Sequence, residues 1–320
     1  MDAVVDELRE KGLLKESEGA QVVDLSEYDM PPCIIITSAG TTIYATRDLA
    51  SLKDRINKYD FDKAIYVVGN EQRLHFKQVF KVLELMGYPE YARKCEHVPF
   101  GLVVDKDGEK IGSRKGNSVF LEDILKEAIQ KVEKIIDEKN PGLEDKGEVA
   151  RKVGVGAIIF NDLSNSRIKD EIFDWDMLLN FQGETGPYIQ YIYVRTRSLL
   201  EKAGYVPDLE NINFSKLQEK EAVETLKLLY RFNEFVTLAA DKNEPSIISR
   251  YLIDVAQNFS TFYNEHKIIT EDKTVQDARL ALTYAVGTVL KSGVTLLGME
   301  MPNNCLLYTS PSPRDTERSR

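Results

Sequence analysis

A glycine-hinged loop carries three cations in a chain that is acidic overall. The stretch EKIGSRKGNSV, residues 109–119, brings Lys110, Arg114 and Lys115 together around two glycines. Glycine allows the backbone to rearrange and to approach a ligand closely. Lysine and arginine can offset the charge that develops on a polyphosphate during group transfer. The sequence has no GxxxxGK[ST] motif, so the loop indicates either a mobile phosphate clamp of another kind or a basic surface loop.

A tyrosine and an aspartate at helical spacing could recognise a cationic substrate. A carboxylate can bind a cationic group through charge-assisted hydrogen bonds. Asp48 follows Tyr44 by four residues, so both side chains would lie on one face if a helix extends through this segment. Two simpler interpretations remain open, in which Asp48 caps the start of a helix and Tyr44 belongs to the core.

The elements that would position these residues alternate between strand and helix. Helices are expected at 2–11, 47–60 and 71–87. Strands, the third of them a continuous apolar run typical of a buried parallel strand, are expected at 33–37, 43–46, 63–70 and 96–105. Residues 30–120 are therefore predicted to form an α/β, doubly wound parallel sheet of Rossmann-like type.

The second half of the chain has helical patterns and almost no strand signal. Helices are expected at 121–140, 146–166, 186–204, 213–241, 246–267 and 275–298. They predict an all-α bundle. One of these helices crowds tyrosines with Arg195 and Arg197. Side chains of both kinds can stack on RNA bases, but tyrosines at this spacing, such as Tyr188 and Tyr191, are expected to lie mainly in the bundle core.

Charge and cysteine content exclude several classes of protein. The 320 residues have a formal net charge of −10, which argues against a protein that coats DNA, because such binding rests on phosphate neutralisation by Lys and Arg. The cysteines are widely spaced, which favours a reducing, cytoplasmic setting without structural zinc. No apolar run is long enough to suggest a membrane partner. Residues 305–320 lack periodicity and are expected to be a non-native tail.

Five segments, in order along the chain, resemble the arginyl-tRNA synthetases of class I. KIGSRKGNSV is similar to their KMSKS signature, in the KMS[ST]RKGN form, with Ile111 in place of Met and Gly112 in place of the first Ser. The other four matching segments are GTTIYATRDLA (40–50), YVVGNEQRLHFKQVF (66–80), FQGETGPYIQYIYVRTRSLL (181–200) and DARLALTYAVGTVLKSGVTLLGMEMPNN (277–304).

The resemblance implies roles for individual residues. Lys110, Arg114 and Lys115 would be catalytic, stabilising the pyrophosphate that leaves ATP, and Ser113 and His97 would border the ATP. Tyr44, Asp48 and Gln72 would contact L-arginine. Arg195 and Arg197 would contact tRNA(Arg), and Mg²⁺ would accompany ATP, with no metal site in the protein itself. A cytoplasmic monomer is expected.

The same resemblance implies a division of the chain. The expected parts are 1–125, the C-terminal portion of the catalytic domain with the signature loop; 126–184, a connecting helical segment; 185–304, the all-α DALR-type anticodon-binding domain; and the tail. The second ATP-binding signature, HIGH, has no counterpart, since no HxGH pattern occurs. The chain is therefore expected to be part of a longer arginine-tRNA ligase and to be inactive alone. A class I synthetase of another specificity and a non-catalytic tRNA-binding module remain alternatives.

Overall fold

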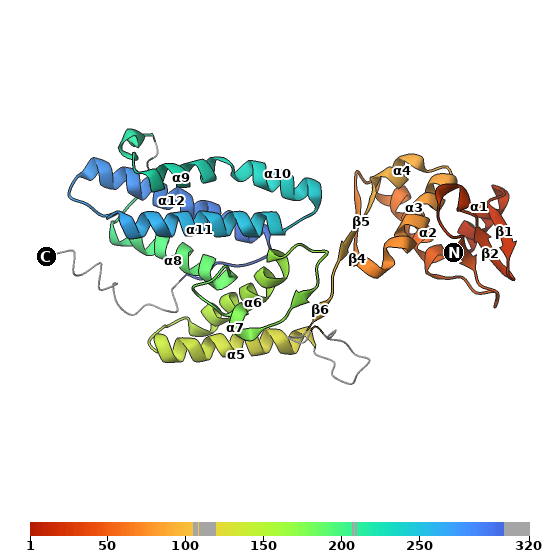
Figure 1. The fold of residues 1–320 in the computed structure, drawn as a ribbon, viewed down its shortest axis with the longest axis horizontal. Coiled ribbons are helices and arrows are strands. Elements are labelled where there is room, and N and C mark those ends of the chain that lie inside the picture. The colour runs from red at the N-terminus through yellow and green to blue at the C-terminus, as the bar shows by residue number, and fades with distance from the viewer. Residues whose placement is uncertain (105–107, 109–119, 207, 209, 304–320) are drawn as a thin grey trace. The chain divides into compact units, whose positions relative to one another are not determined.

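The computed structural model describes residues 1–104, 108, 120–206, 208 and 210–303. The chain divides into two compact units, Met1–Leu102 and Val103–Arg320, whose elements are labelled in Figure 1. Each unit has its own hydrophobic core. The two units are therefore described separately.

The first unit contains both expected types of element. Its helices are α1 (Asp2–Glu10), η1 (Ser26–Tyr28), α2 (Tyr44–Tyr59), η2 (Asn70–Gln72), α3 (Arg73–Leu85) and α4 (Pro89–Lys94). Its strands are β1 (Leu14–Ser17), β2 (Ala20–Val23), β3 (Cys33–Ile36), β4 (Ala64–Gly69) and β5 (Cys95–Phe100). The prediction of extended chain at 43–46 is wrong, because α2 already begins at Tyr44.

An antiparallel sheet of β1, β2 and β3, in that order, was not expected from the sequence. Its first hairpin turns through Glu18 and Gly19, which both have positive φ, at 51° and 76°. Two such residues in succession are typical of the tight turns that match the twist of paired strands. Strand β3 pairs with β2. After β3 the chain turns back, and one isolated antiparallel bridge joins Ile36 to Thr42.

Strands β4 and β5 form the predicted parallel pair. The helix α3 connects them and covers one face, where Tyr66 lies about 5 Å from the rings of Phe76 and Phe80. On β4, Ile65 and Val67 remain half to two-thirds exposed. The core of this unit lies where α1, α2 and α3 meet β2 and β3, with side chains such as Leu8, Leu49 and Val79 fully buried; its further members are Val4, Val5, Val23, Leu25, Cys33, Ile35, Ala45, Leu52, Val82, Leu83 and Met86.

The second unit is almost entirely helical, as predicted. Its helices are α5 (Leu121–Lys139), α6 (Lys146–Ser164), α7 (Trp175–Leu178), α8 (Gly186–Lys202), η4 (Phe214–Lys216), α9 (Lys220–Tyr230), α10 (Phe232–Lys242), α11 (Ser246–Glu265) and α12 (Lys273–Leu296). The single helix expected at 213–241 is instead divided into η4, α9 and α10. Two short strands, β6 (Val103–Val104) and β7 (Glu171–Ile172), were not separately expected.

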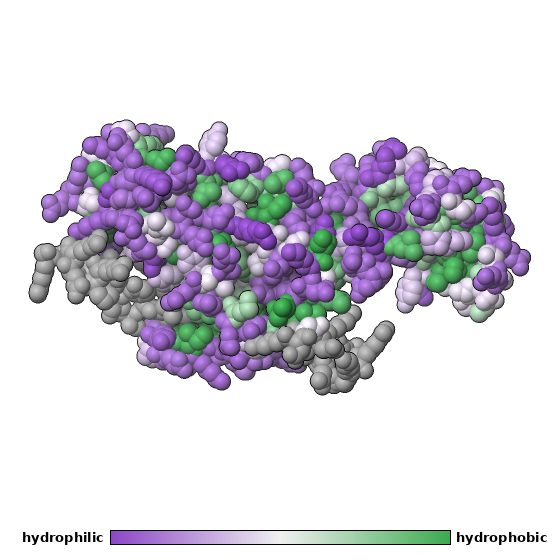
Figure 2. Space-filling view, viewed as in Figure 1, coloured by the Kyte–Doolittle hydropathy of each residue, from purple (hydrophilic) through white to green (hydrophobic). Residues whose placement is uncertain are grey.

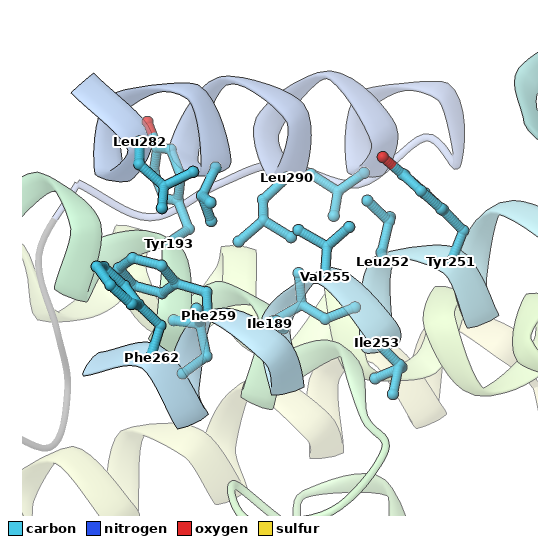
Figure 3. Packing of buried hydrophobic residues seen from close by; sticks show 14 of the residues in the cluster. Ile189, Tyr193, Tyr251, Leu252, Ile253, Val255, Phe259, Phe262, Leu282 and Leu290 are labelled. Atoms are coloured by element: carbon cyan, nitrogen blue, oxygen red, sulfur yellow. The ribbon is translucent and has the colours of Figure 1, made fainter. Parts of the chain in front are cut away.

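The main core of this unit lies between α8, α11 and α12. Figure 3 shows Ile189 of α8, Leu252 and Val255 of α11, and Leu290 of α12 pointing toward one another. All four side chains are fully buried. The buried apolar surface at this junction is the main source of stability for the bundle.

Helices α5 and α6 approach each other closely at one glycine. A Cβ atom added to Gly154 of α6 would lie 2.9 Å from the carbonyl carbon of Ala128 and the amide nitrogen of Ile129, both in the backbone of α5. Gly147, at the start of the same helix, would meet nothing within 4 Å. The close approach therefore depends on the absence of a side chain at Gly154.

The pair β6–β7 places a partly buried carboxyl group beside α6. Val103 pairs in parallel with Glu171, and Asn161 of α6 donates a hydrogen bond to the Glu171 carboxyl group. Burial, followed by the hydrogen bond and charge of Asp162, raises the pKa of Glu171 to about 7. Near neutral pH this group is therefore only partly ionised.

Polar side chains dominate the visible face of both units, with apolar residues in scattered groups (Figure 2). Among the residues that the structure describes, no helix is long and apolar enough to span a membrane.

Candidate arginine site and RNA-facing helix

The first turn of α2 places Tyr44 and Asp48 on one face. Tyr44 is the first residue of the helix, and Asp48 follows one turn later. The Tyr44 side chain is 72% exposed, so Tyr44 is not a core residue. Asp48 does not cap the helix either, because the N-cap position is Ile43. Both simpler interpretations of these residues are therefore excluded by the geometry.

The carboxylate of Asp48 is bonded to a histidine on the next helix. The Nε2 atom of His75, on α3, lies 2.7 Å from Oδ2 of Asp48. An ionised carboxylate can only accept, so this nitrogen carries the proton. The guanidinium of the adjacent Arg47 lies over the Tyr44 ring, 5.6 Å from the centroid. Sequence reasoning missed the His75 contact, because it joins residues 27 positions apart.

His75 is the first of three aromatic rings in contact with one another. Its ring meets Phe76 edge-on at 5.1 Å, and Phe76 stacks on His97 with centroids 4.7 Å apart. Nε2 of His97 lies 2.9 Å from the carbonyl oxygen of Val68 and donates to it, which leaves Nδ1 as the acceptor if the ring is neutral. His97, expected beside ATP, is thus held against β4 by backbone and ring contacts.

Gln72 lies at the carboxyl end of β4. It is the last residue of η2, immediately before α3, and its side chain is exposed. In open α/β sheets, ligands bind beyond the carboxyl ends of the parallel strands. Gln72 and His75 are therefore in the first turns after such a strand end, where a ligand site is common.

The basic loop, with Lys110, Ser113, Arg114 and Lys115, lies outside the described residues. The tail at 305–320 also lies outside them.

In the second unit, α8 holds its two arginines differently. The guanidinium of Arg195 lies over the rings of both Tyr191 and Tyr263, with its carbon 4.6 Å from each centroid. It also donates a hydrogen bond to the Tyr191 hydroxyl. Arg197 is more exposed and forms an ion pair with Glu201 at 2.9 Å. Tyr188 and Tyr191, which were expected mainly in the core, are partly buried and pack against the main cluster.

Comparison with known families assigns both parts of the chain. Residues 1–175 match the model described as tRNA synthetases class I (R), catalytic domain, and residues 189–304 match the DALR anticodon binding domain. The chain therefore belongs to the arginine-type family of class I tRNA synthetases.

The relatives in this family that resemble the chain are arginine–tRNA ligases. The enzyme of Halothermothrix orenii is 50% identical over 303 residues, and that of Clostridium beijerinckii is 53% identical over 302. Each alignment covers 94% of this chain and 53% of the relative. The chain thus spans about half the length of the curated relatives that it matches.

Solved structures give the same family fold. The arginyl-tRNA synthetase of Thermus thermophilus matches with a TM-score of 0.83 and 27% identity, over 94% of this chain and 57% of the other. The Plasmodium falciparum enzyme matches with a TM-score of 0.81 at 24% identity, over 95% and 52%, and supports the fold alone. The predicted combination of a class I catalytic region with a helical DALR domain is confirmed.

Proposed function

We propose that this chain supplies the arginine-recognition and anticodon-binding parts of an arginine–tRNA ligase. The observation that carries the proposal is the pair of exposed Tyr44 and partly exposed Asp48 on one turn of α2, in a chain of this family. The Asp48 carboxylate would bind the guanidinium of L-arginine, Tyr44 would line the pocket, and Gln72 would add a hydrogen bond.

The ligase reaction would use the basic loop as well. ATP and arginine would give arginyl-adenylate and pyrophosphate, and the arginyl group would then pass to a terminal ribose hydroxyl of tRNA(Arg). Lys110, Arg114 and Lys115 would stabilise the leaving pyrophosphate electrostatically, with Ser113 and His97 beside the nucleotide. Mg²⁺ would arrive bound to ATP.

The helical unit would dock the tRNA. Arg195 and Arg197 on α8 are the proposed contacts, and the Arg195 guanidinium already lies over two tyrosine rings. In this proposal the chain acts in the cytoplasm as a monomer. We expect no arginine charging by this chain acting alone, because the sequence has no HxGH pattern to oppose the loop across ATP.

Arginine binding is the direct test. The wild-type chain, titrated with L-arginine and followed by NMR, should bind it, and Asp48→Asn should bind at least about 10-fold more weakly because a charged hydrogen-bond partner is lost. Asp54→Asn is the matched control, since Asp54 lies on the same helix and pairs with Lys58 at an exposed site. Equal binding by wild type and Asp48→Asn would refute the proposed pocket.

The tRNA part is tested separately. Arg197→Ala should weaken binding of a transcribed tRNA(Arg), measured by fluorescence anisotropy, and should reduce the salt dependence of that binding by about one counterion. Unchanged affinity at every salt concentration would remove Arg197 from the interface.

A further inference from the structure

We infer that His75 is a positioning residue that orients the Asp48 carboxylate toward a guanidinium. This inference rests on the proposed arginine site. The observation behind it is the 2.7 Å contact between His75 Nε2 and Asp48 Oδ2, which joins α3 to α2.

The contact leaves the carboxylate able to bind a ligand. An ionised carboxylate has two oxygens and about four acceptor positions, and His75 occupies one of them on Oδ2. Within the part of the chain that the structure describes, Oδ1 and the second position on Oδ2 remain for the two parallel hydrogen bonds that a guanidinium makes. With one oxygen fixed by His75, the plane of the carboxylate is set before the ligand arrives. Preorganisation of this kind reduces the ordering cost of binding.

The histidine is suited to this task because its own ring is held in place. Phe76, only 4% exposed, contacts the His75 ring edge-on and also stacks on His97. His97 is in turn bonded to the Val68 carbonyl of β4. The orientation of Asp48 is therefore supported through a row of rings by the parallel strands β4 and β5.

The same contact contributes little to folding. The side chains of His75 and Asp48 are 24% and 34% exposed, and partly exposed ion pairs of this kind add little to stability. Removing the imidazole should therefore leave the unit folded while it frees the carboxylate to rotate. A positioning role and a structural role thus predict different results.

Geometric preference for a guanidinium separates the two roles. Arginine needs a correctly oriented carboxylate plane, whereas the ammonium of lysine is a point charge that does not. Loss of orientation should therefore reduce the affinity for arginine more than the affinity for lysine. Glutamine at this position places its side-chain N–H₂ near where Nε2 lies and can restore the bond.

The experiment compares four forms of the chain: wild type, His75→Ala, His75→Gln and Asp48→Asn. Dissociation constants for L-arginine and L-lysine are measured by NMR titration, after circular dichroism has confirmed equal helix content. His75→Ala should weaken arginine binding about 10-fold, the effect of one hydrogen bond to a charged group. Lysine binding should change by less than about 2-fold. His75→Gln should bind arginine within about 3-fold of wild type.

The outcomes separate this inference from the proposal beneath it. If wild type and Asp48→Asn bind arginine equally, the arginine site is refuted and the role of His75 with it. If Asp48→Asn loses affinity but His75→Ala does not, only the role of His75 is refuted. Equal losses for arginine and lysine in His75→Ala, without recovery in His75→Gln, would show that the residue is merely structural.

Discussion

Replacing Gly154 by alanine should destabilise the α5–α6 pair although alanine is the better helix former. The new Cβ would lie 2.9 Å from two backbone atoms of α5 and 3.1 Å from a third, the carbonyl oxygen of Ala128. Ordinary contacts between such atoms are about 3.5–4.0 Å. The two helices would therefore have to separate by about half an ångström, and backbone atoms cannot turn aside as a side chain can.

The magnitude follows from two opposing effects. Overpacking of a close contact costs about 1–3 kcal/mol. The gain in helix propensity from glycine to alanine offsets about 0.8–1.0 kcal/mol of that cost. We expect a net loss of up to about 2 kcal/mol in the free energy of unfolding of the helical unit.

Urea denaturation followed by tryptophan fluorescence measures the loss of stability in the helical unit. Trp175 is the only tryptophan in the chain, and Lys131 of α5 lies over its ring at 5.2 Å. The matched control is Gly147→Ala, on the same helix but with open space around the added methyl group. The control should be stabilised by about 0.5 kcal/mol, because the unfolded chain loses conformational freedom.

The two variants should therefore change stability in opposite directions. A Gly154→Ala variant as stable as Gly147→Ala would show that the helices separate at no cost, and the argument from close approach would fail.

Three further predictions concern single contacts. Because the pKa of Glu171 is raised from 4.5 to about 7, its protonated form stabilises the fold at low pH, and this stability is lost as pH rises from about 4.5 to 7. Between pH 5 and pH 8, wild type should lose about 1–2 kcal/mol relative to Glu171→Gln, discounted for partial exposure, in urea titrations. Arg279→Met leaves the carboxylate of Glu219, 17% exposed, without its arginine partner, so the free energy of unfolding, followed by circular dichroism, should fall by about 2–3 kcal/mol. An unchanged free energy of unfolding would mean that the pair adds nothing. Thr46→Val removes a 2.6 Å hydrogen bond to the Ile35 carbonyl, and amide exchange in β3 should show a loss of about 1–2 kcal/mol, whereas unchanged protection would contradict that.

Periodic patterns predicted most of the helices. The segments at 146–166, 246–267 and 275–298 match α6, α11 and α12 closely, because long amphipathic helices have a strong repeat. The split of the expected helix at 213–241 was not visible, since apolar spacing continues across the break. The domain limits expected at 125 and 184 stay predictions, although the chain contacts divide at Leu102.

The antiparallel hairpin was missed for a different reason. Strand β1 is the short, charged sequence LKES, largely exposed, so it lacks the alternation of a half-buried strand. Its turn relies on Glu18 in a left-handed conformation, which a glutamate seldom adopts. Only the following glycine gave a local signal for this turn.

The candidate site was predictable in part. The spacing of Tyr44 and Asp48 indicated a shared face, and α2 places them so. The bond from His75 could not be found by spacing, because it depends on how α3 packs beside α2. Motif resemblance identified the basic loop, but Lys110 and Lys115 lie outside the described residues, so their roles stay predictions.

The contacts of Arg195 with two tyrosine rings lower the entropic cost of an RNA contact made by this side chain. A long side chain that becomes ordered on binding costs about 0.5–1.5 kcal/mol. Arg195 has already lost much of that freedom on folding, because its guanidinium lies over the rings of Tyr191 and Tyr263. Arg197 would instead have to exchange Glu201 for a phosphate. Arg195 would therefore contact a phosphate with a smaller loss of side-chain entropy than Arg197, which lies two positions along the same helix.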